Sequence, residues 1–210
     1  MTEILPATSQ DAINKAVTLL TRGDVVILPT DTIYGIAANI SSKSGVQKIY
    51  DVKSRSPSKP IIIYLTAIEQ LQQLCQGLTE DMLTALNGLW PCAMSGIFMQ
   101  KENAVPTAVT AGRPTVAVRI PDHSLCLDLV ERVGHPLAVT SANISGMETC
   151  KTAQGVAEQL GTKVPLVLDG GPSQRDSPST LVDFTGDMPK LLRQGALSAT
   201  VLKRFLPTLQ

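Results

Sequence analysis

Two short polar segments carry the side chains best suited to chemistry in this sequence. Lys53-Ser54-Arg55 places two cations two positions apart, and Ser141-Ala142-Asn143 places a hydroxyl and an amide at the same spacing. Lysine and arginine supply positive charge for phosphate or carboxylate groups, and arginine can grip two oxygens at once. Serine and asparagine supply short donors and acceptors. Together the two segments predict two walls of a site for an anionic nucleotide.

Further polar residues open, close or interrupt the apolar stretches of the chain. Thr30-Asp31-Thr32 follows one stretch, Ser179-Thr180 opens another, and Arg193 closes a third. Arg119 lies inside the apolar run 115–120, where a charge needs a partner. Since ligands of open α/β sheets bind in the crevice at strand ends, these residues are candidates for the same site.

Each segment taken alone also has a purely structural interpretation. The cations of segment 53–59 would suit a helix C-terminus, where the helix dipole favours positive charge. Ser141 and Asn143 would suit a cap or a turn, and segment 30–32 an ordinary turn. Cysteines are common as small core residues, and the two histidines fit a helix start and a turn. These remaining residues are Cys75, Cys92, Cys126, Cys150, His123 and His135.

The familiar signatures of nucleotide and hydrolase sites are missing from the sequence. It contains no GxxxxGK[ST], GxGxxG, HExxH or GxSxG. No pair of cysteines has CxxC spacing, and with two histidines a zinc site is not expected. Nucleotide chemistry here must therefore use another architecture.

The composition predicts one compact domain. The 210 residues are 43% hydrophobic and 17% charged, which is enough for one sizeable core. Lysine plus arginine and aspartate plus glutamate both number 18, whereas a non-specific nucleic-acid binder carries a basic excess. The N-terminus lacks a signal pattern and no apolar run reaches about 18 residues. We expect a cytoplasmic protein with reduced thiols and no membrane contact.

Buried strands mixed with amphipathic helices must position the polar segments. Lys53 is in phase with Val46, Ile49 and Tyr50, so it should leave its helix near the core. Segment 30–35 is predicted as half turn and half strand, and segment 172–178 as a mobile loop. The expected strands are 25–28, 61–65, 94–99, 115–120, 137–140, 166–168, 180–184 and 190–193. The expected helices are 9–23, 46–53, 68–75, 79–86, 124–133, 152–160 and 198–205. This mixture predicts an α/β protein with helices covering the sheet.

The order of the polar segments resembles the YrdC domain over nearly the whole chain, from about residue 7 to 206. The resemblance implies a single YrdC-like domain, 1–210, with a twisted mixed β-sheet flanked by helices and a concave ligand-binding face. The sequence ends soon after the last motif, so we expect it to lack the extra C-terminal domain of longer members. The matching segments are Leu28-Pro29-Thr30-Asp31-Thr32-Ile33-Tyr34-Gly35, Lys53-Ser54-Arg55, Lys59-Pro60, Thr115-Val116-Ala117-Val118-Arg119-Ile120-Pro121, Thr140-Ser141-Ala142-Asn143-Ile144-Ser145-Gly146, Ser179-Thr180-Leu181-Val182-Asp183 and Leu192-Arg193-Gln194-Gly195.

The resemblance also implies an activity, L-threonylcarbamoyladenylate synthase, which is a nucleotidyltransferase. It joins L-threonine, bicarbonate and ATP into threonylcarbamoyl-AMP and pyrophosphate. The product is passed to the tRNA threonylcarbamoyl transferase machinery, which makes N6-threonylcarbamoyladenosine at position 37. Mg²⁺ bound with ATP is the implied cofactor, and no metal ligand is expected among the protein side chains. Two alternatives are an RNA-binding or ribosome-associated YrdC module and a carbamoyl-transfer domain related to hydrogenase maturation. A direct contact with tRNA or other RNA is left open.

Matching each motif assigns roles to residues of this chain. Lys53 and Arg55 are implied to be catalytic, and both are expected to line the surface of the site. The implied L-threonine ligands are Thr32, Tyr64, Arg119, Val139 and Ser179, with Arg119 on the threonine carboxylate. The implied ATP ligands are Arg55, Lys59, Thr115, Ser141, Asn143, Thr149 and Arg193. Because both reactants are anions, fixed cations would overcome their repulsion and hold them in line.

Two positions depart from the family pattern. The family's W-P-G-P-x-T segment is Trp90-Pro91-Cys92-Ala93-Met94-Ser95 here. If the family glycine supplies a special backbone angle, Cys92 should be strained. Some members have histidine where Tyr64 stands, and tyrosine replaces its hydrogen bond without its charge.

Overall fold

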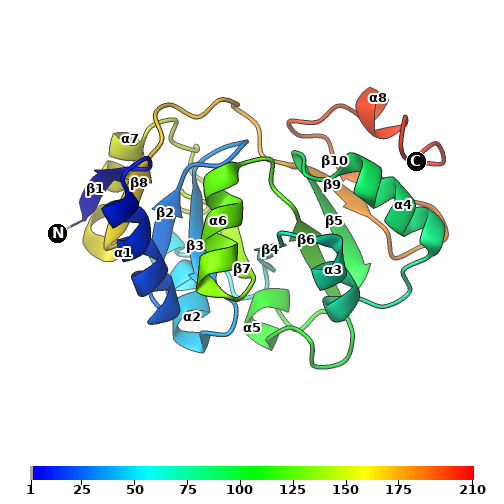
Figure 1. Cartoon of the computed structure of the whole chain (residues 1–210), viewed down its shortest axis with the longest axis horizontal. Helices are drawn as coiled ribbons and strands as arrows, with labels where there is room; N and C mark the ends of the chain where they lie inside the picture. Colours follow the sequence, from blue (N-terminus) through cyan, green and yellow to red (C-terminus); the bar gives the residue numbers. More distant parts are fainter. Residues whose placement is uncertain (1) are drawn as a thin grey trace.

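Ten β-strands form one continuous mixed sheet in the computed structural model, which describes residues 2–210 (Figure 1). The strand order across the sheet is β1-β8-β2-β3-β7-β4-β6-β5-β9-β10. The strands are β1 (Glu3–Pro6), β2 (Val26–Leu28), β3 (Gly35–Asn39), β4 (Ile62–Tyr64), β5 (Met94–Met99), β6 (Thr115–Arg119), β7 (Leu137–Ser141), β8 (Leu166–Asp169), β9 (Thr180–Asp183) and β10 (Lys190–Arg193). Strands distant in sequence are therefore neighbours in space, as β3 and β7 or β5 and β9 are.

Helices flank this sheet, and polar side chains cap several of them. The helices are α1 (Gln10–Thr21), α2 (Lys43–Lys53), α3 (Ile68–Leu74), α4 (Glu80–Leu89), α5 (Thr107–Thr110), α6 (Ser124–Val133), α7 (Ala153–Leu160) and α8 (Ala199–Leu202), with a 3₁₀ turn, η1, at Gly161–Lys163. Ser9 and Ser42 accept backbone N–H bonds at the starts of α1 and α2. Ser54 ends α2 in the left-handed conformation, with φ 49°. Because of this turn, the side chains of Lys53 and Arg55 point in different directions.

The two faces of the sheet are covered unequally. On one face α1 and α6 pack side by side (Figure 1). Their Leu20 and Leu129 belong to one apolar cluster with Leu28 and Leu137 of the sheet. Tyr64 belongs to the same layer, but it also lines a cavity over the neighbouring strands. The opposite face packs against the larger core, to which α2, α4 and α7 contribute. The first face is thus partly filled by helices and partly concave.

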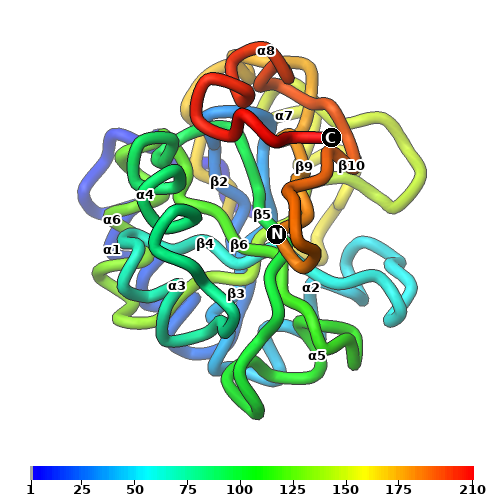
Figure 2. Tube along the Cα trace, turned by 90° about the vertical axis from the view of Figure 1, so that its right-hand side faces the viewer, coloured from blue at the N-terminus to red at the C-terminus, as the bar shows by residue number. Residues whose placement is uncertain are grey.

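The ends of the sheet are closed by the chain termini. β1 pairs in parallel with β8 at one edge. At the other edge, the backbone N–H of Leu191 donates to Gln210 at 2.7 Å, and Gln210 N–H donates to Pro189 at 3.0 Å. The last residues therefore lie beside β10, as Figures 1 and 2 show.

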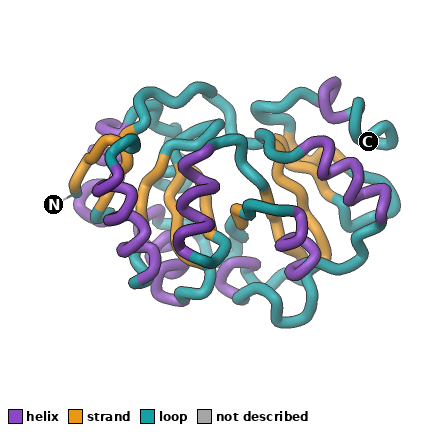
Figure 3. The backbone as a smooth tube through the Cα atoms, viewed as in Figure 1, coloured by secondary structure: helices purple, strands orange, loops and turns teal. Residues whose placement is uncertain are grey.

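The structure confirms the predicted fold class and most of the predicted elements (Figure 3). Prediction missed β1, α5 and most of β3. The β3 sequence Gly35–Asn39 has one β-branched residue, so its strand propensity is weak, although all five residues are buried between β2 and β7. The last helix is shorter than predicted and spans Ala199–Leu202. Within residues 2–210 no helix is both long and apolar enough to cross a membrane.

Candidate active site

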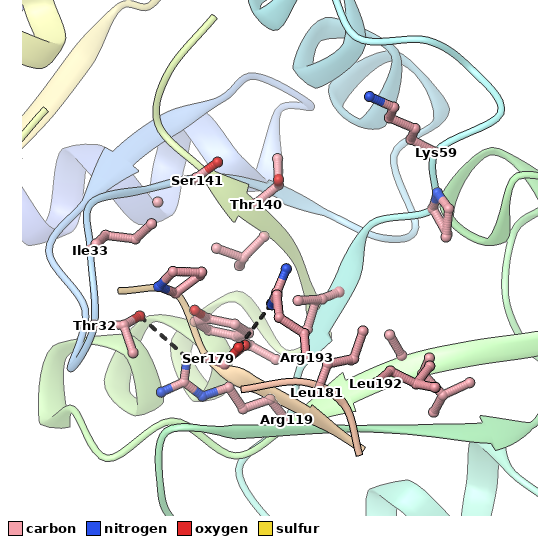
Figure 4. A pocket seen from close by; sticks show the side chains of 18 of the residues that line it. Thr32, Ile33, Lys59, Arg119, Thr140, Ser141, Ser179, Leu181, Leu192 and Arg193 are labelled. Atoms are coloured by element: carbon pink, nitrogen blue, oxygen red, sulfur yellow. Dashed lines mark hydrogen bonds between the residues drawn. The ribbon is translucent and has the colours of Figure 1, made fainter. Parts of the chain in front are cut away.

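A cavity of about 450 Å³ opens on the concave face (Figure 4). Its volume lies within the range of small-molecule sites, about 300–1,000 Å³. Its walls come from the segment before β3, the loop after α2, and strands β4, β5, β6, β7, β9 and β10. The structure places these predicted site residues on its surface: Thr32, Arg55, Lys59, Tyr64, Arg119, Val139, Ser141, Ser179 and Arg193. Their individual roles stay predictions.

The cavity wall is strongly cationic although the chain carries no net charge. Five cationic side chains line it, and no aspartate or glutamate does. Such a concentration of one sign attracts anions and raises their local concentration. Arg113 belongs to this set and was not predicted, because its position before β6 carries no chemical signal in the sequence. The cations are Arg55, Lys59, Arg113, Arg119 and Arg193.

Lys53 lies beneath the cavity wall and does not line its surface, so the expectation of a surface-lining side chain was wrong. It is 1% exposed, and its ammonium donates to the loop after β7. The acceptors are the backbone oxygen of Ser141, the backbone oxygen of Asn143 at 2.7 Å and Asn143 Oδ1 at 3.1 Å. Burial, with a smaller effect of nearby Arg55, lowers the pKa of Lys53 to about 7.

The loop held by Lys53 is also held through the backbone. Ser145 N–H donates to the carbonyl oxygen of Lys53 at 2.8 Å, and Ala142 N–H donates to Tyr34 at 2.8 Å. Within the loop, Ser141 Oγ donates to Asn143 Oδ1 at 2.6 Å. These bonds fix Ser141 on the cavity wall and turn the Asn143 side chain inward.

Arg55 leaves α2 toward the cavity and braces the loop that follows it. Its Nε donates to the carbonyl oxygen of Lys59 at 3.2 Å, and its Nη2 donates to that of Pro60 at 2.8 Å. Partial burial lowers the pKa of Arg55, and the guanidinium remains a cation. The motif Lys53-Ser54-Arg55 thus divides its two charges between the interior and the cavity.

Arg119 is buried at the threonine end of the predicted site, where it already has a protein partner. Its Nη2 forms an ion pair with Asp31, and its Nε donates to the Cys92 carbonyl at 3.0 Å. Figure 4 shows the third contact, in which Nη1 donates to Thr32 Oγ1 at 3.4 Å. Its guanidinium carbon lies 5.7 Å from the centre of the Tyr64 ring. The sequence showed that Arg119 needs a partner but did not identify Asp31.

The β9–β10 wall contributes Ser179 and Arg193. Arg193 Nη2 donates to the carbonyl oxygen of Ser179 at 2.8 Å (Figure 4), and the hydroxyl of Ser179 lies 2.8 Å from that of buried Ser95. A Cβ added at Gly195 would lie 2.2 Å from the carbonyl oxygen of Pro178. Gly195 is therefore required by close backbone approach, which places Arg193 against Ser179.

Four predicted site residues do not line the cavity. Lys53 and Asn143 lie beneath its wall. Thr115 is half-buried at the start of β6, on the same strand face as Ala117 and Arg119, which do line the cavity. Thr149 lies in the loop before α7. Thr115 thus extends the cavity face, whereas Thr149 is outside the cavity lining.

The departures from the family pattern place neither Cys92 nor Tyr64 in a left-handed backbone conformation. Cys92 is not among the described residues with positive φ, so the expected strain is not found. Its carbonyl accepts from Arg119, and its N–H donates to Ile120 at 3.1 Å. Burial raises the pKa of Cys92 to about 11 and that of Tyr64 to about 12. Both side chains are therefore protonated near neutral pH.

The predicted mobile segment 172–178 is a loop between β8 and β9. Ser173 N–H donates to the Lys151 carbonyl at 2.7 Å, and the Lys151 ammonium pairs with Asp176 at 2.7 Å. Pro178, at its end, lines the cavity. The motion of this loop stays a prediction.

No cluster of three or more His, Cys, Asp or Glu suited to a metal occurs among the described residues. The cavity wall offers hydroxyl groups and cations, but no carboxylate. Magnesium prefers carboxylate, phosphate and water oxygens. The residues present therefore do not fit a metal held by the protein itself.

The mixed sheet, its flanking helices and the cavity on the concave face define an α/β protein with a cavity whose charge suits anionic small molecules. A family model described as "Telomere recombination" (Sua5_yciO_yrdC) matches residues 18–195. The chain belongs to this Sua5/YciO/YrdC family, as the resemblance of its motifs predicted.

Individual relatives agree with this assignment. The chain is 38% identical over 192 residues to threonylcarbamoyl-AMP synthase of Bacillus subtilis, covering 91% of this chain and 56% of that protein. It is 33% identical over 201 residues to a putative threonylcarbamoyl-AMP synthase of Mycobacterium tuberculosis, covering 96% and 92%. These relatives do not favour the RNA-binding or carbamoyl-transfer alternatives.

A solved structure matches the fold closely. The crystal structure of P. abyssi Sua5 complexed with L-threonine superimposes with a TM-score of 0.93 at 32% identity, covering 100% of this chain and 63% of that one. The chain thus spans little more than half the length of several relatives that it matches.

Proposed function

We propose that this protein is an L-threonylcarbamoyladenylate synthase. The amine of L-threonine and bicarbonate give a carbamate and water, and a carbamate oxygen then attacks the α-phosphorus of ATP. The bond from the α-phosphorus to the bridging oxygen breaks, and pyrophosphate leaves. This makes the enzyme a nucleotidyltransferase, with threonylcarbamoyl-AMP as its product.

One observation carries the proposal: a single cavity joins the predicted threonine residues to predicted ATP residues, with five cations and no carboxylate on its wall. Arg119 and Thr32 lie at one part of it, and Arg55 and Arg193 line other walls. The carbamate and the triphosphate are both anions, so bringing them together requires fixed positive charge. This cavity supplies that charge before the reactants arrive.

Different residues bind the two reactants. Arg119 and Thr32 bind the threonine carboxylate and hold the amino acid in place. Arg55, Lys59 and Arg193 neutralise the phosphates, and Ser141 contacts the nucleotide. Lys53 holds the loop that carries Ser141. The rate enhancement comes from alignment of the reactants and stabilisation of their charge, and no nucleophile of the protein takes part.

The names of the relatives support this function. Those of Bacillus subtilis and Pyrococcus abyssi are called threonylcarbamoyl-AMP synthase. The Pyrococcus abyssi Sua5 structure carries L-threonine. Bicarbonate as the third substrate and transfer of the product to the tRNA threonylcarbamoyl transferase machinery belong to the same proposal. Mg²⁺ would enter with ATP, bound by its phosphates, and offset part of their charge.

The test is pyrophosphate release by the purified protein with ATP, Mg²⁺, bicarbonate and L-threonine. We expect release only when L-threonine is present, and a product with the mass of threonylcarbamoyl-AMP. D-threonine serves as the matched control because it has the same groups in mirror-image arrangement. Release that is independent of L-threonine, or no release, would show that the proposed function is wrong.

A further inference from the structure

Asp31 and Arg119 form an ion pair between two segments that are 88 residues apart. The side chains of Arg119 and Asp31 are 2% and 10% exposed, so water screens the pair little. A buried pair of this kind requires good geometry to repay the loss of hydration. From the sequence, segment 30–32 is a candidate for the site or an ordinary turn, and neither interpretation predicts this pair.

The turn does not need the Asp31 carboxylate. Aspartate in a turn commonly accepts a hydrogen bond from a nearby backbone N–H. Here Thr30 takes that place, because its Oγ1 accepts from Thr32 N–H at 3.0 Å and donates to the Ile33 carbonyl at 2.8 Å. Asp31 Oδ2 bonds to Arg119, and Oδ1 is buried without a hydrogen-bond partner among the described residues. Arg119 is thus the only described partner of this carboxylate.

The position of Asp31 suits a group that orients a cation without opposing an anionic ligand. Arg119 lines the cavity, whereas Asp31 does not. The carboxylate therefore contacts the guanidinium from behind the wall. Together with the Cys92 carbonyl and Thr32, it fixes the guanidinium through three of its N–H groups. An arginine has five such donors, so two remain for a ligand.

We infer that Asp31 is the positioning residue that aims Arg119 at the carboxylate of the amino-acid substrate. This inference rests on the proposed function, since it takes L-threonine as the ligand of Arg119. Without the pair, the guanidinium would sample several orientations, and the bidentate geometry that suits a carboxylate would be lost. Loss of the Asp31 carboxylate should therefore weaken the binding of L-threonine and leave the binding of ATP unchanged.

Asp31→Asn tests the inference, because it keeps the size of the side chain and removes its charge. We expect the KM for L-threonine to rise about tenfold, as for loss of one charge-assisted hydrogen bond. The KM for ATP and kcat should stay within about twofold. Asp24→Asn is the matched control, because it breaks the Asp24–Lys48 pair outside the cavity and should change neither KM.

Asp31→Glu covers the case in which Asp31→Asn does not fold. It keeps the charge that Arg119 needs, but its longer side chain displaces the guanidinium. We expect a folded protein with a raised KM for L-threonine alone. An unchanged threonine KM in the folded variants overturns the inference, as does a parallel rise of both KM values. If the unsubstituted protein releases no pyrophosphate with L-threonine, the proposed function fails and this assignment fails with it.

Discussion

The ammonium of Lys53 lies 2.7 Å from the backbone oxygen of Asn143, a residue 90 positions later in the chain. The two motifs that were predicted to form the walls of the anion site are therefore joined beneath the cavity surface. Lys53 supports one wall from within, while Arg55 carries the charge of the same motif that lines the cavity. This relationship changes what substitution of each residue should do.

Lys53→Met should lower activity by disturbing the Ser141–Asn143 loop. The substitution leaves the buried backbone oxygen of Asn143 without its donor, which costs about 1–3 kcal/mol of unfolding free energy. Because misplacing a binding group by about 1 Å can cost about a hundredfold in rate, we expect a loss of that order in kcat. Pyrophosphate release and urea unfolding measure the two effects. Lys48→Met, on the exposed side of α2, should change neither by much.

The stability of the protein should depend on pH through Lys53. Burial lowers its pKa from 10.5 to about 7 in the folded state. Between these values the unfolded chain binds more protons than the folded protein, so the unfolding free energy contributed by Lys53 rises with pH. Below the folded pKa Lys53 is protonated in both states, so it does not change the unfolding free energy with pH.

Urea unfolding at about pH 7 and about pH 9 measures this slope. We expect the unsubstituted protein to gain stability with pH relative to Lys53→Met, which lacks the titrating group. A difference that is constant or shrinks with pH would contradict a lowered pKa.

Arg55→Ala should weaken ATP binding and leave the fold intact. Its guanidinium donates to two carbonyl oxygens of the loop after α2, and both can bind water instead. We expect the KM for ATP to rise about tenfold or more, as for loss of a charged hydrogen bond. Arg132→Ala is the control, because Arg132 pairs with Asp128 outside the cavity. An unaltered ATP KM would remove Arg55 from the nucleotide site.

Gly195→Ala should disturb the β9–β10 wall. The new Cβ would meet the carbonyl oxygen of Pro178 and the backbone of Ser179, which can yield only by moving the chain. We expect a loss of about 1–3 kcal/mol in unfolding free energy, as for overpacking, and weaker substrate binding. At Gly186 the only nearby atom is 4.0 Å away, so Gly186→Ala should be tolerated. Equal effects at both sites would show that Gly195 has no special role.

The sequence by itself determined most of the elements, the family and the candidate residues. The apolar runs around Ile27, Ile63 and Val118 predicted buried strands, because strand burial follows from local pattern. Arg119 within such a run indicated a buried charge in need of a partner. The order of seven short motifs indicated the YrdC domain, although no single motif was decisive.

Only the tertiary structure decided which residues meet. It paired Asp31 with Arg119, buried Lys53 beneath Asn143, brought Arg113 to the cavity and pressed Gly195 against Pro178. These contacts depend on the strand order, which joins β3 to β7 and β5 to β9. Local periodicity records which face of an element is buried, but it does not record which distant segment packs there, because that is settled by the packing of the whole sheet.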